Sequence, residues 1–384
     1  MKSYTVFLFS LCIAADIFGQ SRVSDAFSFS TKVTGDFIYN FTGGIKQGYT
    51  YLGMEDFSIE FDSEAAGWWK GGIFFVHGLN AHGNGMSENY SGDLQVLSNI
   101  DAGDYTGLYE FYYMQGIGNF SFLIGQHDLN TEFVGTKYGG TFINSSFGIV
   151  PSISLNMPVS IYPVAAPCLL LKYQSGNTLV YKFAVYDGDP GNFETNRFNL
   201  QWNINSKEGA FSIAEVEYNR YLDGQISGTY KLGSYYHTGT FLNYTDTSTF
   251  HKGNFGIYAI VDQALFNRSL HAGRGLCLYF QGGITPQRFN QVAYYVGTGL
   301  RYHGIISNRY YDELGVAIAH TSMGKAFCQT YQIPKRSETA LEATYKFDFG
   351  RKYSIQPSLQ YILNPGAGLF KNCFVSLMRF SLEY

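Results

Sequence analysis

The residues with the clearest potential for chemistry lie in one long stretch, residues 125–162, which has no regular hydrophobic period. Loops longer than about 12–15 residues are uncommon in compact domains and usually carry function. The charged and hydrogen-bonding side chains that we select from this stretch as candidates are Asp128, Asn130, Glu132, Lys137, Tyr138, Asn144 and Ser145. Phe133, Phe142, Phe147 and Ile153 make the stretch too apolar for a disordered linker. We therefore expect a loop that packs against the rest of the protein.

Motifs for catalysis, metal or cofactor binding are weak. Ser322–Lys325 fits SxxK, but the SDN and KTG boxes that accompany this motif in enzymes are absent. His77 and His82 flank a Gly-rich segment, which we expect to be a turn, and lack further metal ligands. The sequence contains no GxSxG, HExxH or P-loop. We predict no catalytic residues, no metal, no cofactor and no enzymatic activity.

Alternating hydrophobicity indicates the elements that must hold the loop. Residues 197–205, 338–348 and 353–363 each show period two, as expected of half-buried strands. In the first, one face carries Phe198, Leu200, Trp202 and Ile204. Segments of this kind recur along the chain between Gly, Asn and Asp, and predict roughly 16–18 strands.

Periodicity does not say which face points outward. A soluble sandwich buries the apolar face, whereas a membrane barrel turns it to lipid and lines its lumen with polar groups. Aromatic residues recur near strand ends, the strands are too many for an ordinary sandwich, and the alternating segment 374–384 ends on Tyr384. We therefore predict an all-β fold, a transmembrane antiparallel β-barrel of about 16 strands.

Composition agrees with a membrane barrel. Charged residues make up 15% of the chain and aromatics 18%, whereas soluble domains average about 25% charged. The net charge of −4 gives no basic excess, so we expect no nucleic-acid partner. Residues 1–19 resemble a cleaved signal peptide, and 20–384 would form one barrel domain. The four remaining cysteines, Cys168, Cys277, Cys328 and Cys373, form no CxxC pair, so we expect no disulfide framework.

The strand pattern also predicts which charged side chains line the lumen. If the apolar faces meet lipid, the opposite parity places Glu110, Arg197, Glu215 and Arg301 on the inner wall. Both signs of charge are about equally represented among the predicted inward residues. We therefore expect a wet interior of mixed charge, without the basic ladder that would indicate an anion pathway.

Several segments are similar to the carbohydrate-selective porin family of OprB type. They include Phe41–Gly44, Tyr90–Gln95, Phe142–Gly148, Gln356–Pro357 and Asn364–Gly366. The resemblance covers nearly all of residues 20–384 in order. It implies a barrel of about 16 strands in the Gram-negative outer membrane, through which sugars diffuse. It also implies that residues 125–162 fold inward as a constriction loop.

The chain departs from the family pattern in two places that bear on the pore. Cys168 follows Pro167 where the family usually has Gly, and Asn84 stands where we expect a basic residue. The missing charge at residue 84 alters the expected electrostatics of the constriction.

The resemblance implies passive, sugar-selective diffusion of mono- and small oligosaccharides into the periplasm. The predicted partners are glucose-like sugars, small oligosaccharides and outer-membrane lipid, and a homo-oligomer is left open. The seven loop residues and four wall residues named above are the expected pore lining. An alternative is that Asn144–Phe147 is a turn that satisfies its own backbone. An alternative function is a non-conducting barrel that serves as an adhesin or structural surface protein.

Overall fold

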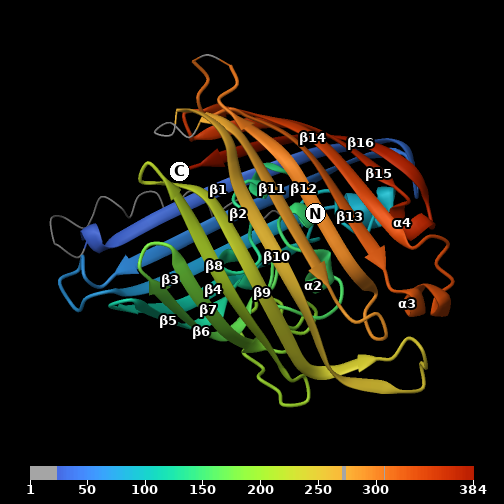
Figure 1. Cartoon of the computed structure of the whole chain (residues 1–384), viewed down its shortest axis with the longest axis horizontal. Coiled ribbons are helices and arrows are strands. Elements are labelled where there is room, and N and C mark those ends of the chain that lie inside the picture. The colour runs from blue at the N-terminus through green and yellow to red at the C-terminus, as the bar shows by residue number, and fades with distance from the viewer. Residues whose placement is uncertain (1–23, 270–273, 307) are drawn as a thin grey trace, which may run out of the picture.

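The computed structural model describes residues 24–269, 274–306 and 308–384. The predicted signal peptide, residues 1–19, lies outside the described residues. The described chain forms sixteen antiparallel strands, each paired with its neighbours in sequence. The first strand pairs with both the second and the last, so the sheet closes into a barrel (Figure 1). The predicted fold class is thus confirmed.

The strands are β1 (Phe27–Gly44), β2 (Gly48–Asp62), β3 (Gly72–Gly83), β4 (Tyr105–Ile117), β5 (Phe120–His127), β6 (Ala166–Ser175), β7 (Leu179–Asp187), β8 (Ala210–Leu222), β9 (Gln225–Leu242), β10 (Phe250–Ser269), β11 (Arg274–Ile284), β12 (Val292–His303), β13 (Glu313–Met323), β14 (Ser337–Phe349), β15 (Tyr353–Leu363) and β16 (Lys371–Glu383). The α-helices are α1 (Leu129–Glu132), α2 (Pro151–Ser154), α3 (Lys325–Thr330) and α4 (Pro365–Gly368). No helix in the described ranges is long and apolar enough to cross a membrane.

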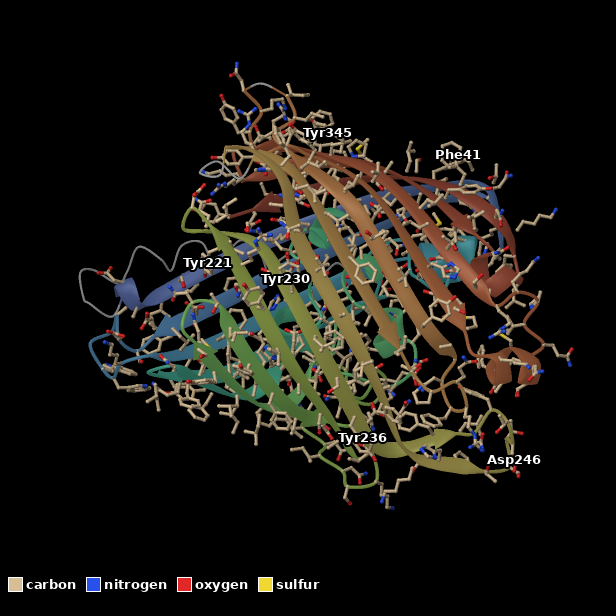
Figure 2. The ribbon with its side chains drawn as sticks, in the orientation of Figure 1. Phe41, Tyr221, Tyr230, Tyr236, Asp246 and Tyr345 are labelled. Carbon is tan, nitrogen blue, oxygen red and sulfur yellow. The ribbon has the colours of Figure 1, made fainter. Side chains whose placement is uncertain are left out.

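The two faces of the wall follow the period-two pattern. In β16, Phe374 and Phe380 are exposed on the outer face, whereas Val375 and Leu377 are buried on the inner face. An apolar outer face is what contact with lipid requires. Tyr221 lies near one end of the wall, and Tyr236 lies toward the other end (Figure 2). Aromatic side chains near both ends match the girdles that mark the two membrane interfaces.

The connections differ between the two ends of the barrel. Residues 118–119, 176–178, 223–224 and 350–352 form short turns at one end. Residues 84–104, 128–165, 188–209 and 324–336 form long connections at the other. In outer-membrane barrels the short turns face the periplasm. This rule assigns the short-turn end to the periplasmic side.

The predicted strand at residues 197–205 is wrong, because this segment belongs to the long connection 188–209. Asn199 adopts a left-handed conformation with φ of 51°, which interrupts the extended backbone. The alternation in the sequence nevertheless corresponds to an alternation of exposed and less exposed side chains around Asn199. Phe198, Leu200, Trp202 and Ile204 are 49, 66, 48 and 72% exposed, and Asn199 is buried.

This segment lies across a step in the wall where strands β5, β6 and β7 end early. The backbone N–H of Leu108 in β4 donates to the carbonyl of Phe198 at 2.9 Å. The Trp202 indole Nε1 donates to Gln126 Oε1 in β5 at 2.8 Å. The segment therefore occupies the free edge of β4 without forming a strand.

Candidate functional site

The connection between β5 and β6, residues 128–165, packs its apolar side chains against the inner wall. Phe133, Phe147 and Ile153 are fully buried. The rings of Phe142 and Phe147 lie 5.5 and 6.1 Å from that of Tyr279 in β11, measured between centroids. Figure 1 shows this connection within the outline of the barrel. The aromatic residues that make the stretch too apolar for a linker thus anchor it to the wall.

Wall carboxylates hold the irregular backbone of this loop. Glu342 in β14 accepts the backbone N–H groups of Ile143 and Asn144 at 2.9 and 3.0 Å. Asp262 in β10 accepts those of Lys137 and Tyr138 at 2.9 and 3.0 Å. A buried loop must satisfy each backbone polar group, and bonds to an ionised acceptor are the strong ones.

Glu215 in β8 holds a strained point of the loop. It accepts the backbone N–H of Val134 at 3.1 Å and the Tyr258 hydroxyl at 2.8 Å. Lys182 in β7 lies 3.1 Å from the same carboxylate. Val134 has φ of 65°, a conformation that β-branched residues rarely adopt and that costs about 1–3 kcal/mol. The hydrogen bonds and the ion pair of Glu215 offset this conformational cost at Val134.

Wall donors bind the carbonyl groups of the loop in the same way. Lys182 Nζ donates to the Glu132 carbonyl and Lys231 Nζ to the Gly135 carbonyl, both at 2.7 Å. Tyr235 donates to the Ser152 carbonyl in α2 at 2.8 Å. The inner wall beneath the loop is therefore a buried polar core, whereas the sequence predicted a wet interior.

Glu110 in β4 lies at the point where the loop begins. Its Oε1 accepts the backbone N–H of Asp128 at 3.0 Å, and its Oε2 lies 3.2 Å from His77 Nδ1. His77 Nε2 lies 3.0 Å from Asp56 in β2. The turn expected around His77 and His82 is wrong, because both residues lie within β3. The register of β3 explains the position of His77. His77 lies opposite Glu110 of β4 on one side and Ser58 of β2 on the other.

Asp128 is the N-cap of α1, and its Oδ1 accepts the backbone N–H of Asn130 at 2.8 Å. Burial, together with the nearby charge of Glu110, raises the pKa of Asp128 to about 7. Burial of this carboxyl in the loop thus brings its pKa close to neutral.

The structure places the predicted site residues in three settings. Buried against the wall are Glu110, Asp128, Tyr138, Asn144 and Glu215. Half-buried are Asn130, Glu132, Ser145 and Arg301, and exposed are Lys137 and Arg197. Arg197 lies on the connection 188–209, where its guanidinium stands over the Phe198 ring. Contact of these residues with a solute stays a prediction.

Asn144 also fits the turn that the sequence left as an alternative. Its Oδ1 accepts the backbone N–H of Ser146 at 3.1 Å, which caps the short helical turn Ser145–Phe147. Its Nδ2 donates to Gln360 Oε1 in β15 at 3.1 Å. Asn144 therefore both forms the turn and joins it to the wall.

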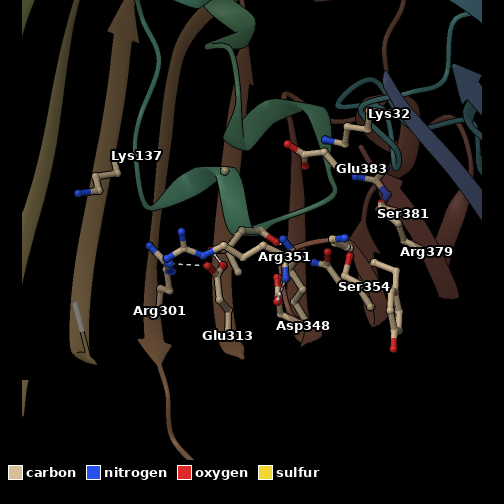
Figure 3. Close-up of a pocket in the computed structure, with 16 residues that line it drawn as sticks. Lys32, Lys137, Arg301, Glu313, Asp348, Arg351, Ser354, Arg379, Ser381 and Glu383 are labelled. Atoms are coloured by element: carbon tan, nitrogen blue, oxygen red, sulfur yellow. Dashed lines mark hydrogen bonds and ion pairs between the residues drawn. The ribbon is translucent and has the colours of Figure 1, made fainter. Parts of the chain in front are cut away.

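A cavity of about 270 Å³ lies between the loop and strands β1 and β12–β16. Its lining residues are Lys32, Lys137, Gly140, Thr141, Arg301, Glu313, Lys346, Asp348, Arg351, Lys352, Tyr353, Ser354, Gln356, Arg379, Ser381 and Glu383. Figure 3 shows Arg301 and Glu313 on the wall, with Lys137 to one side and Lys32 to the other. Of the predicted site residues, Lys137 and Arg301 line this cavity.

Sequence reasoning missed the charge of this cavity. Seven lining residues are Lys or Arg, whereas three are Asp or Glu. The inward lysine of β14, Lys346, was a usable signal, since β14 ends next to the turn that carries Arg351 and Lys352. The equal balance of charge predicted for the whole interior does not hold here.

The described residues contain no group of three or more His, Cys, Asp or Glu placed to hold a metal ion. Cys168, Cys277, Cys328 and Cys373 are free and buried. The structure therefore shows no disulfide among these four residues.

A closed sixteen-stranded barrel with an apolar outer face and a loop packed on its inner wall defines a bacterial outer-membrane porin. Residues 46–381 match the carbohydrate-selective porin family OprB, and the chain belongs to this family. This assignment confirms the resemblance found in the sequence. Proteins of this fold and family are channels and not enzymes.

Solved structures and curated relatives agree with the assignment. The structure of Pseudomonas putida OprB at high pH superposes with a TM-score of 0.84 at 21% identity, covering 94% of each chain. The channel DcaP of Acinetobacter baumannii has a TM-score of 0.59 at 8% identity, covering 93% of this chain and 97% of that one.

Two curated relatives are porins. The putative porin QuiX of Acinetobacter baylyi is 23% identical, over 61% of this chain and 57% of its own length. Porin B of Pseudomonas aeruginosa is 24% identical, over 53% of this chain and 52% of its own length. The aligned regions thus span about half the length of these relatives.

Proposed function

We propose that this protein is a pore for passive, sugar-selective diffusion of mono- and small oligosaccharides into the periplasm. The observation that carries the proposal is the cavity between the loop and the wall, in a chain of the carbohydrate-selective porin family. In this proposal, residues 125–162 are the constriction loop.

The lining of the cavity suits a solute with many hydroxyl groups. Gln356, Ser354 and Ser381 offer hydrogen bonds to neutral hydroxyls. Behind this lining, the Tyr138 ring lies beneath Arg301, with the guanidinium 5.6 Å from the ring centroid. Individually weak hydrogen bonds from the lining let a solute bind and leave again, as conduction requires.

In the proposal, the hydrogen bonds between the loop and the wall fix the size of the opening. Its backbone is tied to Glu215, Asp262 and Glu342 on three separate strands. In the proposal, Lys137 and Arg301 face the solute, while buried residues such as Asn144 keep the loop in place. Seven further predicted site residues support the opening from behind: Glu110, Asp128, Asn130, Glu132, Tyr138, Ser145 and Glu215.

Two measurements on the purified chain test the proposal. Liposome swelling with glucose, maltose and longer maltodextrins should show entry of small sugars and a clear size limit. Single-channel recording should show that glucose or maltodextrin reduces ion current. Lys137→Ala combined with Arg301→Ala should raise the conductance and the size limit, because both side chains project into the cavity.

A matched control is Lys371→Ala combined with Arg288→Ala, two exposed residues that do not line the cavity. Its conductance should equal that of the wild type. Equal effects of both double variants would contradict the placement of the narrowing. Absence of any conductance would contradict the pore and favour the alternative, a non-conducting adhesin or structural surface protein.

A further inference from the structure

The cations of the cavity fall into two groups, paired and unpaired. Arg301 forms an ion pair with Glu313, and Arg379 pairs with Asp36 at 2.8 Å. Glu313 also accepts the Thr141 hydroxyl of the loop at 2.5 Å. These acids are thus already occupied by protein groups.

Five further cations of the cavity form no ion pair with any residue of the described ranges. They are Lys32, Lys137, Lys346, Arg351 and Lys352. Two lining acids remain to balance them. Asp348 accepts the backbone N–H of Arg351 at 2.8 Å, and Glu383 lies opposite Lys32 in the β1–β16 register. The cavity therefore carries an excess of positive charge.

One buried donor of a lining residue also lacks a partner. Nε of Arg301 is buried and forms no hydrogen bond with the residues described. A buried donor without an acceptor is costly, at about 1–3 kcal/mol. The Arg301 side chain is therefore not fully satisfied by protein groups.

We propose that the cavity is an anion-binding subsite of the pore, which takes the carboxylate or phosphate group of a charged sugar. The inference rests on the proposed function and extends it from neutral sugars to sugar acids or sugar phosphates. Arg and Lys recognise both groups by charge-assisted hydrogen bonds. The volume of about 270 Å³ lies just below the range of about 300–1,000 Å³ of drug-sized sites, which suits a single sugar ring.

The position of the subsite determines when a solute would meet it on the way through the pore. Arg351 and Lys352 lie in the turn between β14 and β15, one of the short turns that we assign to the periplasmic end, and Lys346 lies near the end of β14 beside it. A charged solute that passes the loop would meet these cations before it leaves the pore. Clustered charges in a low-dielectric cleft concentrate counter-ions on the order of tenfold or more.

The test is current block in a planar bilayer with three probes that share one hexose ring: glucose, glucuronate and glucose 6-phosphate. The two anions should block at concentrations lower than glucose by on the order of tenfold. This advantage should shrink at high salt, because the Debye length falls from about 10 Å at 0.1 M to about 3 Å at 1 M. Block by one anion alone would support the subsite and identify its preferred group.

Lys346→Gln combined with Lys352→Gln should reduce the advantage of the anions over glucose toward one. Neither side chain is buried, so the double variant should fold. The control Lys70→Gln combined with Lys371→Gln removes the same charge from exposed positions outside the cavity, and should retain the advantage. Equal block by glucose and both anions in the wild type would overturn the subsite but not the sugar pore. A chain that conducts no ions and admits no sugar would overturn the proposed function itself.

Discussion

Glu342 holds Asn144 by its backbone N–H at 3.0 Å, although the two residues are 198 positions apart in the chain. The second carboxylate oxygen accepts the N–H of Ile143 and the hydroxyl of Ser358, both at 2.9 Å. One wall carboxylate thus fixes two consecutive amides of an irregular, buried backbone.

Glu342→Ala should therefore destabilise the protein strongly, because it leaves two buried N–H groups without acceptors. Each costs about 1–3 kcal/mol. Thermal unfolding in detergent should show the loss, and single-channel traces should show a noisier or wider opening as the loop loosens. Glu383→Ala removes an exposed carboxylate from β16 and should leave the unfolding temperature nearly unchanged. Equal unfolding temperatures for the two variants would refute the anchoring role.

Lys182 offers a test of the buried charges. Its ammonium lies 3.1 Å from both Glu215 and Glu217 and is almost fully buried. Lys182→Met should cost about 3–5 kcal/mol, because it leaves the buried Glu215 carboxylate uncompensated. Lys172→Met is the matched control, since Lys172 makes a more exposed pair with Glu132 worth about 0–1 kcal/mol. Chemical unfolding gives the free energy of unfolding of both variants. Comparable losses in the two would contradict a special cost of leaving Glu215 without its partner.

The stability of the loop should depend on pH through Asp128. Its pKa is raised from 3.8 to about 7 in the folded protein, so its ionisation opposes folding. The penalty is absent below about pH 4, grows as pH rises, and is complete above about pH 7. It amounts to a few kcal/mol at about 1.4 kcal/mol per pKa unit.

Asp128→Asn should remove this penalty, because Asn caps helices about as well as Asp. The variant should gain stability relative to the wild type at pH 8 and not at pH 4. Unfolding midpoints at the two pH values give the comparison. A gain of the same size at both would show that Asp128 ionisation is not the cause.

Trp202 should lie in contact with lipid. It sits on the connection 188–209, whose four exposed apolar side chains continue the lipid-facing wall above β5. The other two tryptophans, Trp68 and Trp69, belong to the turn between β2 and β3. In a Trp68→Phe, Trp69→Phe background, vesicles of brominated lipid should quench the remaining fluorescence strongly.

Trp202→Phe in the wild-type chain keeps Trp68 and Trp69 as the remaining tryptophans. Its fluorescence provides the reference for quenching at the membrane interface. Weak quenching of Trp202 together with a dimer or trimer by cross-linking would instead assign the surface to a second copy of the chain. Weak quenching of a monomer would place the segment in water.

The faces of the strands could be predicted from the sequence, because alternation reports directly which side of a pleated sheet each residue occupies. Leu341 and Glu342 illustrate this, as one is exposed outward and the other buried inward. The same alternation explains why the predicted strand at 197–205 is wrong. An extended segment lying across the wall needs the same alternation as a strand within it, and the left-handed turn at Asn199 leaves little trace in the pattern.

The site could be predicted only in part. Length and composition predict the loop, but its contacts depend on how the barrel closes in three dimensions. Asp262 meets Lys137 across 125 positions, and no local pattern reports such a contact. The basic cavity likewise joins residues of β1, β12 and β14–β16 with the loop. The basic residues of the cavity come from separate strands and from the loop. A count of charges along each strand therefore does not reveal the cluster that they form in the folded protein.

The anchors of the loop also constrain the order of assembly. Asn144 and its neighbours bind to β14 and β15, which are among the last strands in the chain. Contacts of such long sequence separation form late, since loop-closure entropy must be overcome first. A nascent chain that lacks these strands has no acceptors for the amides of Ile143 and Asn144. The Ile143–Asn144 part of the loop is thus positioned by the carboxyl-terminal strands, and the same strands that close the sheet complete its interior.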